Sequence, residues 1–204
     1  MRVGLIGYGK MNRLIEKALP YPVTCITRDL VKDLSADLYI DFSHHSCVET
    51  NALLLSTHNK CHLIGTTGWE SPHVPAAYRK KGAGLFCPNF SYEMNRFLSV
   101  VRLMVAKLGP PDEATEWHHH SKADRPSGTA KLIASFTGVS FTSVRTEETI
   151  FKHRLRWGEI TLSHEACDRA EYVIGAIRAC EWLYGKQGWY DDFFGCLHAA
   201  CHPL

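Results

Sequence analysis

Residues 116–130, with the sequence EWHHHSKADRPSGTA, hold the densest group of chemically active side chains in the chain. Three consecutive histidines, His118 to His120, precede Lys122 and a turn that contains Ser127-Gly128-Thr129. Histidine triplets are uncommon. A segment of this composition could bind a metal ion, transfer protons or be purely structural.

A metal site here would need ligands from elsewhere in the chain. Side chains alternate along an extended segment, so we expect His118 and His120 to share one face and His119 to oppose them. The pair could hold a metal ion only with a third ligand. The stretch 196–204, CLHAACHPL, offers cysteines and histidines, but its spacings match no familiar zinc pattern. We therefore predict no metal site and keep zinc as an alternative.

Proton transfer explains more of the segment. A helix that opens at Ser127-Gly128-Thr129 presents N–H groups and hydroxyls, which suit a carboxylate. Lys122 suits a second carboxylate or a proton donation. Histidine titrates at about 6.5, which makes it a natural proton carrier at cellular pH. The segment predicts acid-assisted chemistry on a small dicarboxylate.

The elements that position these residues follow from the hydrophobic pattern. In the first 90 residues, short apolar runs alternate with helical patterns, which indicates a parallel, doubly wound, Rossmann-type α/β sheet. We expect strands over 2–7, 23–27, 37–43, 61–68 (with its loop) and 83–88, and helices over 10–19, 46–58 and 74–82.

After residue 90 the rhythm changes to that of a second, smaller α+β domain. We expect helices over 91–109, 128–136 and 169–185, an extended segment over 113–120, and strands near 139–151 and 158–166. We therefore expect residues 1–90 with 170–204 to form a dinucleotide-binding domain. Residues 91–169 would form a substrate-binding and oligomerisation domain.

The stretch GLIGYGKMN, after the first expected strand, fits a dinucleotide-binding fingerprint. Gly7 would allow the tight turn, and Gly9 would let the backbone approach a pyrophosphate at the helix N-terminus. Asn12 replaces the third glycine, so we expect slightly looser packing of the helix on the strand. A plain strand-to-helix turn is the alternative.

The end of the second expected strand bears on cofactor choice. An NAD site usually has an acidic residue there, whereas this chain has Thr27 and then Arg28, which could pair with a 2′-phosphate. Lys10 is a second cation, so the sequence favours NADPH or the use of both cofactors. An ordinary surface arginine is the alternative. The loops 65–68 (GTTG) and 87–90 (CPNF) follow expected strands and would edge the nicotinamide half.

Composition excludes other classes of function. The net charge is +2 without a lysine or arginine block, so nucleic-acid binding has no support. No stretch approaches the roughly 20 apolar residues of a membrane-spanning helix. The amino terminus does not resemble a secretion signal, and the 8 cysteines include no C-x-x-C pair. We expect reduced thiols and a cytoplasmic location.

At residues 116–130 the chain resembles a known family. The pattern E-x-H-H-x-x-K-x-D-x-P-S-G-T-A is the signature of dihydrodipicolinate reductases. The segments IDFS (40–43), GTTG (65–68), NFS (89–91), ITLSHEACDR (160–169) and GAIRACEWLYGKQGWYDDFF (175–194) also resemble that family in order. The resemblance implies NADPH- or NADH-dependent reduction of 4-hydroxy-tetrahydrodipicolinate to tetrahydrodipicolinate in lysine and diaminopimelate biosynthesis.

The resemblance also implies roles for single residues. His118 would be the proton donor and acceptor, and Lys122 a second proton donor. The substrate would be held by His119, Ser127, Gly128 and Thr129. The cofactor site would be lined by Gly7, Tyr8, Gly9, Lys10, Met11, Arg28, Gly65, Thr66, Thr67, Cys87, Pro88, Asn89 and Phe90.

The chain departs from the family in length and in assembly signals. It is shorter than usual, and the region between the helix after Thr129 and GEITLSH (158–164) is abbreviated. The family uses that region for subunit pairing, so the resemblance implies a homotetramer while a dimer is conceivable. Two alternative functions remain: that of another two-domain NAD(P)-dependent imine or aldehyde dehydrogenase, and that of a nucleotide sensor without turnover.

Overall fold

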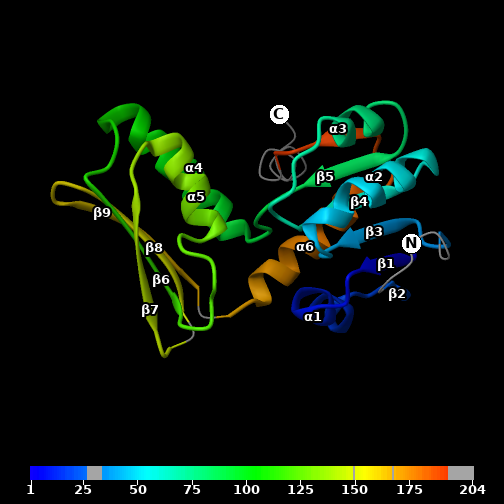
Figure 1. The fold of residues 1–204 in the computed structure, drawn as a ribbon, viewed down its shortest axis with the longest axis horizontal. Helices are drawn as coiled ribbons and strands as arrows, with labels where there is room; N and C mark the ends of the chain where they lie inside the picture. Colours follow the sequence, from blue (N-terminus) through cyan, green and yellow to red (C-terminus); the bar gives the residue numbers. More distant parts are fainter. Residues whose placement is uncertain (27–33, 149, 167, 193–204) are drawn as a thin grey trace. The chain divides into compact units, whose positions relative to one another are not determined.

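A computed structural model of the chain describes residues 1–26, 34–148, 150–166 and 168–192. The chain divides into two compact units (Figure 1). The first comprises Met1–Ser91 and Tyr172–Leu204, and the second comprises Tyr92–Glu171. None of the described helices is both long and apolar enough to cross a membrane.

The first unit is built on a six-stranded sheet in which every pair of neighbours is parallel. The strand order is β10-β5-β4-β3-β1-β2, so the order reverses between β1 and β3. The central strands are fully buried, as their apolar runs predicted. The strands are β1 (Val3–Ile6), β2 (Val23–Ile26), β3 (Leu38–Asp41), β4 (Cys61–Ile64), β5 (Ala83–Phe86) and β10 (Gly188–Tyr190).

Helices flank this sheet and complete the Rossmann-type layers that the sequence predicted. α2 and α3 pack against the strands at the β4–β5–β10 side, and α1 packs on β1. Their bounds are α1 (Lys10–Ala18), α2 (Val48–Thr57), α3 (His73–Tyr78) and α6 (Ala170–Leu183), with a short 3₁₀ turn, η2 (His45–Cys47), before α2. The three-residue strand β10 was not predicted, because so short a run carries no periodicity.

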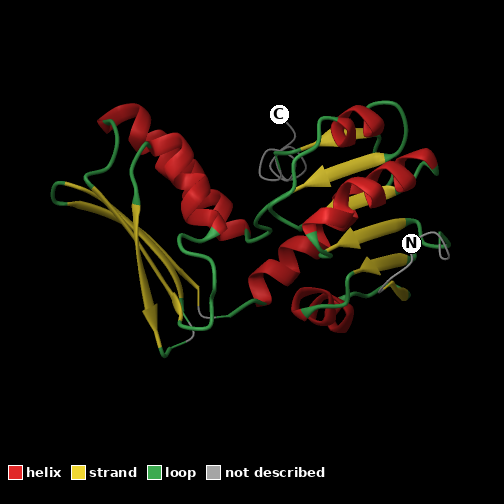
Figure 2. Cartoon of the chain, in the orientation of Figure 1, coloured by secondary structure: helices red, strands yellow, loops and turns green. Residues whose placement is uncertain are grey.

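The second unit has a four-stranded sheet with two helices on one side of it (Figure 2). The order is β7-β6-β8-β9, with β6 parallel to β7 and the other pairs antiparallel. One apolar cluster joins both helices to the sheet and includes Phe97, Ile133 and Leu155. The elements are α4 (Tyr92–Leu108), β6 (Glu113–His119), α5 (Gly128–Thr137), β7 (Phe141–Thr146), β8 (Phe151–Trp157) and β9 (Ile160–Ala166).

Two expectations for this unit were wrong. The strand expected near 139–151 is β7, which ends at Thr146, and a further strand, β8, begins at Phe151. Three cations in FKHRLRW obscured an alternating pattern whose inward residues are apolar or histidine. His118 and His120 also do not share a face. β6 ends at His119, and His120 lies in the following turn, exposed and paired with Glu147 at 3.2 Å.

Candidate active site

The register of the four strands places the chemical groups of the second unit in rows on one face of its sheet. The row under the helices is apolar and consists of Phe141, Ala114, Leu155 and Leu162. The next row is polar and consists of Ser143, Glu116, His153 and His164. The third row consists of Arg145, His118, Phe151 and Ala166. Side chains alternate along each strand, so these rows all face the helices.

Glu116 is fully buried at the centre of the polar row. Its carboxylate accepts the backbone N–H of Ser127 at 3.1 Å to each oxygen and the hydroxyl of Ser143 at 2.7 Å. Burial opposes ionisation, but these hydrogen bonds and the His118 imidazole hold the pKa of Glu116 below its ordinary value. Glu116 is therefore an ionised carboxylate in the interior at neutral pH.

Arg145 connects this carboxylate to the loop that carries Lys122. Its Nη1 lies 3.5 Å from Glu116 Oε1, while its Nε donates to the Lys122 carbonyl at 3.3 Å. Its Nη2 donates to the Asp124 carbonyl at 2.6 Å. The guanidinium side chain is only 6% exposed, so it holds the loop from the inside.

His118 is buried beside Glu116, with its Nδ1 at 3.5 Å from Glu116 Oε2. Among the described residues this Nδ1 has no hydrogen-bond partner. Burial lowers the pKa of His118, the carboxylate of Glu116 opposes that shift, and the positive charges of Lys122 and Arg145 add to it. A depressed pKa makes the protonated imidazole a ready proton donor.

His153 stands across from Glu116 on β8, with its Nε2 at 3.9 Å from Glu116 Oε2 and 3.4 Å from Ser127 Oγ. Burial, followed by the charge of His118, lowers the pKa of His153 to about 3. Ligand atoms of Glu116, His118 and His153 lie within 4.8 Å of one another. A cation, Arg145, already faces the same carboxylate at 3.5 Å. Proton transfer by this cluster stays a prediction, with a metal site as the alternative.

The remaining predicted substrate residues gather at the start of α5. Ser127 caps this helix by accepting the Ala130 N–H at 3.2 Å. The Lys122 ammonium contacts Asp124 at 2.8 Å, and Asp124 also accepts a backbone N–H from Gly128. The Asp124 carboxylate thus contacts the Lys122 ammonium and the Gly128 N–H, two groups that the sequence assigned to a substrate carboxylate.

Two further predicted residues sit beside this turn. His119 is half-buried at the end of β6, where its Nδ1 contacts Ser121 Oγ at 2.7 Å. Thr129 is the second residue of α5. The structure therefore brings the residues predicted for proton transfer and substrate binding together in the second unit. The sequence did not indicate Arg145, Ser143 or His153, which come from other strands.

Gly7, Gly65 and Phe90, three of the residues predicted for the cofactor, lie in neighbouring loops at the carboxyl ends of the strands in the first unit. Gly7 has φ +77°, and a methyl group on it would lie 2.6 Å from the Ser43 Cα. A methyl group on Gly65 would collide with the Phe42 ring, which itself contacts the Phe90 ring edge-on at 6.1 Å. The loops after β1, β3, β4 and β5 are therefore mutual neighbours.

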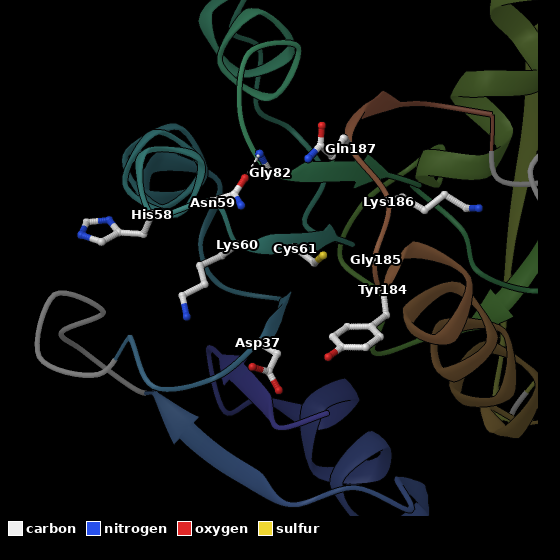
Figure 3. A pocket seen from close by; sticks show the side chains of 10 residues that line it. All are labelled: Asp37, His58, Asn59, Lys60, Cys61, Gly82, Tyr184, Gly185, Lys186 and Gln187. Atoms are coloured by element: carbon white, nitrogen blue, oxygen red, sulfur yellow. Dashed lines mark hydrogen bonds between the residues drawn. The ribbon is translucent and has the colours of Figure 1, made fainter.

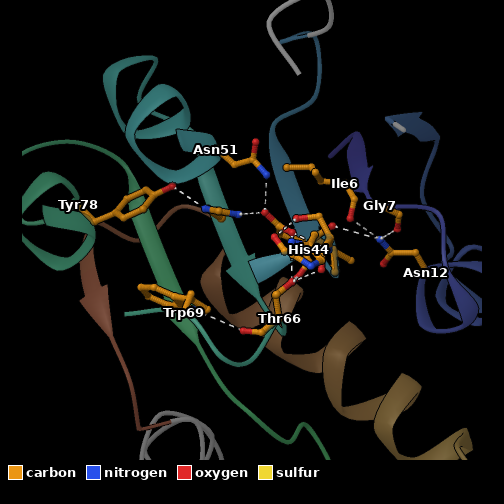
Figure 4. Close-up of polar contacts among 12 residues, drawn as sticks. Ile6, Gly7, Asn12, His44, Asn51, Thr66, Trp69 and Tyr78 are labelled. Carbon is orange, nitrogen blue, oxygen red and sulfur yellow. Dashed lines mark hydrogen bonds and ion pairs between the residues drawn. The ribbon is translucent and has the colours of Figure 1, made fainter. Parts of the chain in front are cut away.

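Asn12 closes the contact between α1 and the sheet. It is fully buried, and its Nδ2 donates to the carbonyls of Ile6 at 2.9 Å and Gly7 at 2.6 Å (Figure 4). The looser packing that we expected at this position is wrong, because the amide fills the space and ties the helix to β1. Gly9 precedes α1 as its N-cap, with no side-chain cap.

A second buried carboxylate, Asp41, organises the loops of this unit. It accepts from the Ser43 N–H at 2.8 Å and from Asn51 Nδ2 at 2.9 Å, and His62 Nε2 lies at 3.3 Å. The Thr66 hydroxyl donates to the Asp41 carbonyl at 3.2 Å, and Trp69 Nε1 donates to the Thr66 carbonyl at 2.9 Å (Figure 4). Burial opposes ionisation, yet the His62 contact holds the pKa of Asp41 below its ordinary value.

Other predicted cofactor residues vary in exposure. Tyr8 donates its hydroxyl to Glu16, and Cys87 contacts the Asn89 carbonyl at 2.9 Å through its Sγ. Asn89 Oδ1 accepts the Ser91 N–H at 2.9 Å, which fixes the loop after β5. Lys10, Thr67 and Pro88 are exposed, and Met11 is half-buried. Thr27 and Arg28 lie outside the described residues, so the 2′-phosphate contact stays a prediction.

A hollow of about 350 Å³ lies at the opposite ends of the strands (Figure 3). It is lined by Asp37, His58, Asn59, Lys60, Cys61, Gly82, Tyr184, Gly185, Lys186 and Gln187. Several of these immediately precede β3, β4, β5 and β10, so the hollow is at the amino ends. Ligands of open α/β sheets bind at the carboxyl ends, and we do not assign the cofactor to this hollow.

Comparisons with known proteins agree with this arrangement. The model "Dihydrodipicolinate reductase, N-terminus" matches residues 17–90, and "Dihydrodipicolinate reductase, C-terminus" matches residues 94–193. The 4-hydroxy-tetrahydrodipicolinate reductase of Methanococcus maripaludis is 32% identical over 93% of this chain and 80% of its own length. That of Thermosipho africanus is 28% identical over 98% of this chain and 99% of its own length.

A solved structure resembles the fold across both units. The dihydrodipicolinate reductase of Paenisporosarcina sp. TG-14, solved with dipicolinate bound, has a TM-score of 0.77 and 18% identity. The match covers 95% of this chain and 98% of that one. The Rossmann-type sheet with a smaller second domain, as predicted from the sequence, is confirmed.

Proposed function

The chain belongs to the dihydrodipicolinate reductase family, and from this membership we propose that it reduces 4-hydroxy-tetrahydrodipicolinate to tetrahydrodipicolinate with NADPH or NADH. This reaction belongs to lysine and diaminopimelate biosynthesis. The observation that carries the proposal is the complete signature over 116–130, in which the buried carboxylate of Glu116 lies 3.5 Å from His118 Nδ1 and accepts the Ser127 backbone N–H. A dehydrogenase of another substrate has no need for that combination.

The first unit fits a nicotinamide dinucleotide. A methyl group on Gly9 would meet no atom within 4 Å, so there is open space beside the first N–H groups of α1. Those N–H groups suit a pyrophosphate. Gly7 follows β1 at the strand-order reversal, and Gly65 and Phe90 follow β4 and β5 at the same carboxyl edge of the sheet, where such ligands bind. The nucleotide supplies the hydride when bound.

The second unit would bind the cyclic dicarboxylate and supply protons. The backbone N–H groups at Gly128 and Thr129, the Ser127 hydroxyl and the His119 imidazole would hold carboxylate oxygens. Lys122 would pair with a substrate carboxylate in exchange for its present contact with Asp124. His118 would protonate the substrate as hydride arrives, which avoids a negatively charged intermediate.

The proposal is tested by following NADPH absorbance with substrate made freshly by dihydrodipicolinate synthase. We expect NADPH oxidation that depends on both the synthase product and this protein, and parallel oxidation with NADH. The matched control is His118→Gln at equal concentration. Nucleotide binding without turnover of the synthase product would refute the proposal and favour a nucleotide sensor.

We also propose that the protein is a cytoplasmic homo-oligomer. Among the described residues no disulfide links Cys25, Cys47, Cys61, Cys87 and Cys180, which suits a reducing compartment. The family resemblance supports a tetramer, and the abbreviated region before GEITLSH (158–164) makes a dimer the alternative. Light scattering after size exclusion distinguishes these states, and a monomer at micromolar concentration would refute the assembly.

A further inference from the structure

Four groups of the second unit contact or face the same carboxylate, that of Glu116. Glu116 accepts the backbone N–H that begins the substrate-binding turn at Ser127. It faces the Nδ1 of His118 and the Nε2 of His153. It also faces the guanidinium of Arg145, which in turn holds the carbonyl groups of the loop that carries Lys122.

We propose that Glu116 is a positioning residue that sets the proton affinity of His118 and fixes the Ser127 turn and the Lys122 loop relative to it. The inference rests on the proposed function only for the role of His118 as proton donor. Glu116 would not touch the substrate, because it is fully buried and its oxygens are already occupied by protein donors.

The energetics favour such a role over a purely structural one. An ionised carboxylate in the interior is costly unless it is fully hydrogen-bonded. A well-packed apolar pair is usually as stable at such a position. The donors on Ser127, Ser143 and Arg145 supply those hydrogen bonds. They do not explain why the same charge also faces two imidazoles, at 3.5 Å and 3.9 Å, without a hydrogen bond to either.

The charges around His118 determine the sign of the expected effect. Glu116 on its own strand and Asp124 in the loop before α5 favour the imidazolium. Lys122 in that loop and Arg145 on β7 disfavour it. On β8, His153 is neutral at neutral pH, and Phe151 contributes a ring at 6.1 Å.

Loss of the Glu116 charge removes the buried carboxylate that favours the protonated form of His118. In Glu116→Gln the pKa of His118 should therefore fall further.

The first experiment is an NMR titration of the histidine side chains without substrate or nucleotide. The His118 resonance is the one that disappears in His118→Gln. We expect Glu116→Gln to shift this titration to lower pH, and the matched control Glu165→Gln, which removes a carboxylate on β9 that pairs with Lys152 at 2.8 Å, to leave it in place. An unshifted His118 titration in folded Glu116→Gln overturns the proposal, whatever reaction the protein catalyses.

The second experiment separates charge from reach. Glu116→Asp keeps the charge but retracts the carboxylate by one methylene, so the His118 titration and the pH–rate profile should stay near those of the wild type. kcat/KM should fall by about 100-fold, because misplacement by about 1 Å has that effect. Should Glu116→Gln fail to fold, Glu116→Asp alone decides. A kcat/KM in Glu116→Asp equal to that of the unmutated protein overturns the positioning role. The proposed function is tested separately, by whether the unmutated protein turns over the synthase product at all.

Discussion

Gly175 couples helix α6 to a loop that we propose to hold the cofactor. A methyl group on Gly175 would overlap the carbonyl oxygen of Phe90 and lie 2.8 Å from its carbonyl carbon. In an ordinary helix, glycine-to-alanine substitution stabilises by about 1 kcal/mol. Here the added methyl group clashes with backbone, and this overpacking should cost about 3 kcal/mol, from which the gain is subtracted. We expect Gly175→Ala to be less stable by about 2 kcal/mol.

A chain of this length loses roughly 2–4 °C in Tm per kcal/mol, so a fall of about 4–8 °C is expected. Calorimetry measures the Tm, and fluorescence titration measures NADPH affinity, which should weaken because the Asn89–Phe90 loop is displaced. Gly128→Ala is the control for stability: it is also in a helix, and a methyl group there meets no atom within 4 Å. A Gly175→Ala variant as stable as Gly128→Ala would refute this reasoning.

Other expected outcomes concern charge and protonation. His118→Gln should lower kcat strongly with little change in NADPH affinity, measured by steady-state kinetics and nucleotide titration; unchanged kcat would remove its proton-transfer role. Arg28→Leu should weaken NADPH more than NADH, and equal losses would end the 2′-phosphate argument. Because the pKa of His153 is lowered to about 3, the unfolded chain takes up its proton first as pH falls below the ordinary value of 6.5. The free energy of unfolding should therefore be highest above pH 6.5 and should fall by about 2 kcal/mol by pH 5, as measured by denaturant unfolding. His153→Gln should show a smaller fall. Chelators should leave turnover unchanged, since Arg145 already serves as the cation beside Glu116; loss of activity that zinc restores would support the metal alternative.

Local signals predicted most of the architecture. The apolar runs and helical periods identified β1 to β5 and the helices, because each element forms from neighbours in the sequence. β8 was missed because its charged residues, such as Arg154, mask the alternating burial of His153 and Leu155. β10 was missed because three residues cannot display a period.

The candidate site was predictable only where the signature is contiguous. His118, Lys122 and Ser127 lie within one short segment, so their pattern was visible. Arg145 and His153 join them through strand register, which no local pattern encodes. Glu116 was visible as a letter of the signature, but its central place required knowledge of what surrounds it.

The polar row of Ser143, Glu116, His153 and His164 matters for deciding which homologous sequences keep this site. Strand faces alternate with a period of two, so one residue inserted within β8 ahead of His153 would turn that imidazole outward. The fifteen-letter signature would be untouched and would still be recognised in a search. A homologue therefore has to be checked for two features: the motif itself, and a register in the neighbouring strands that keeps these side chains on the same face of the sheet.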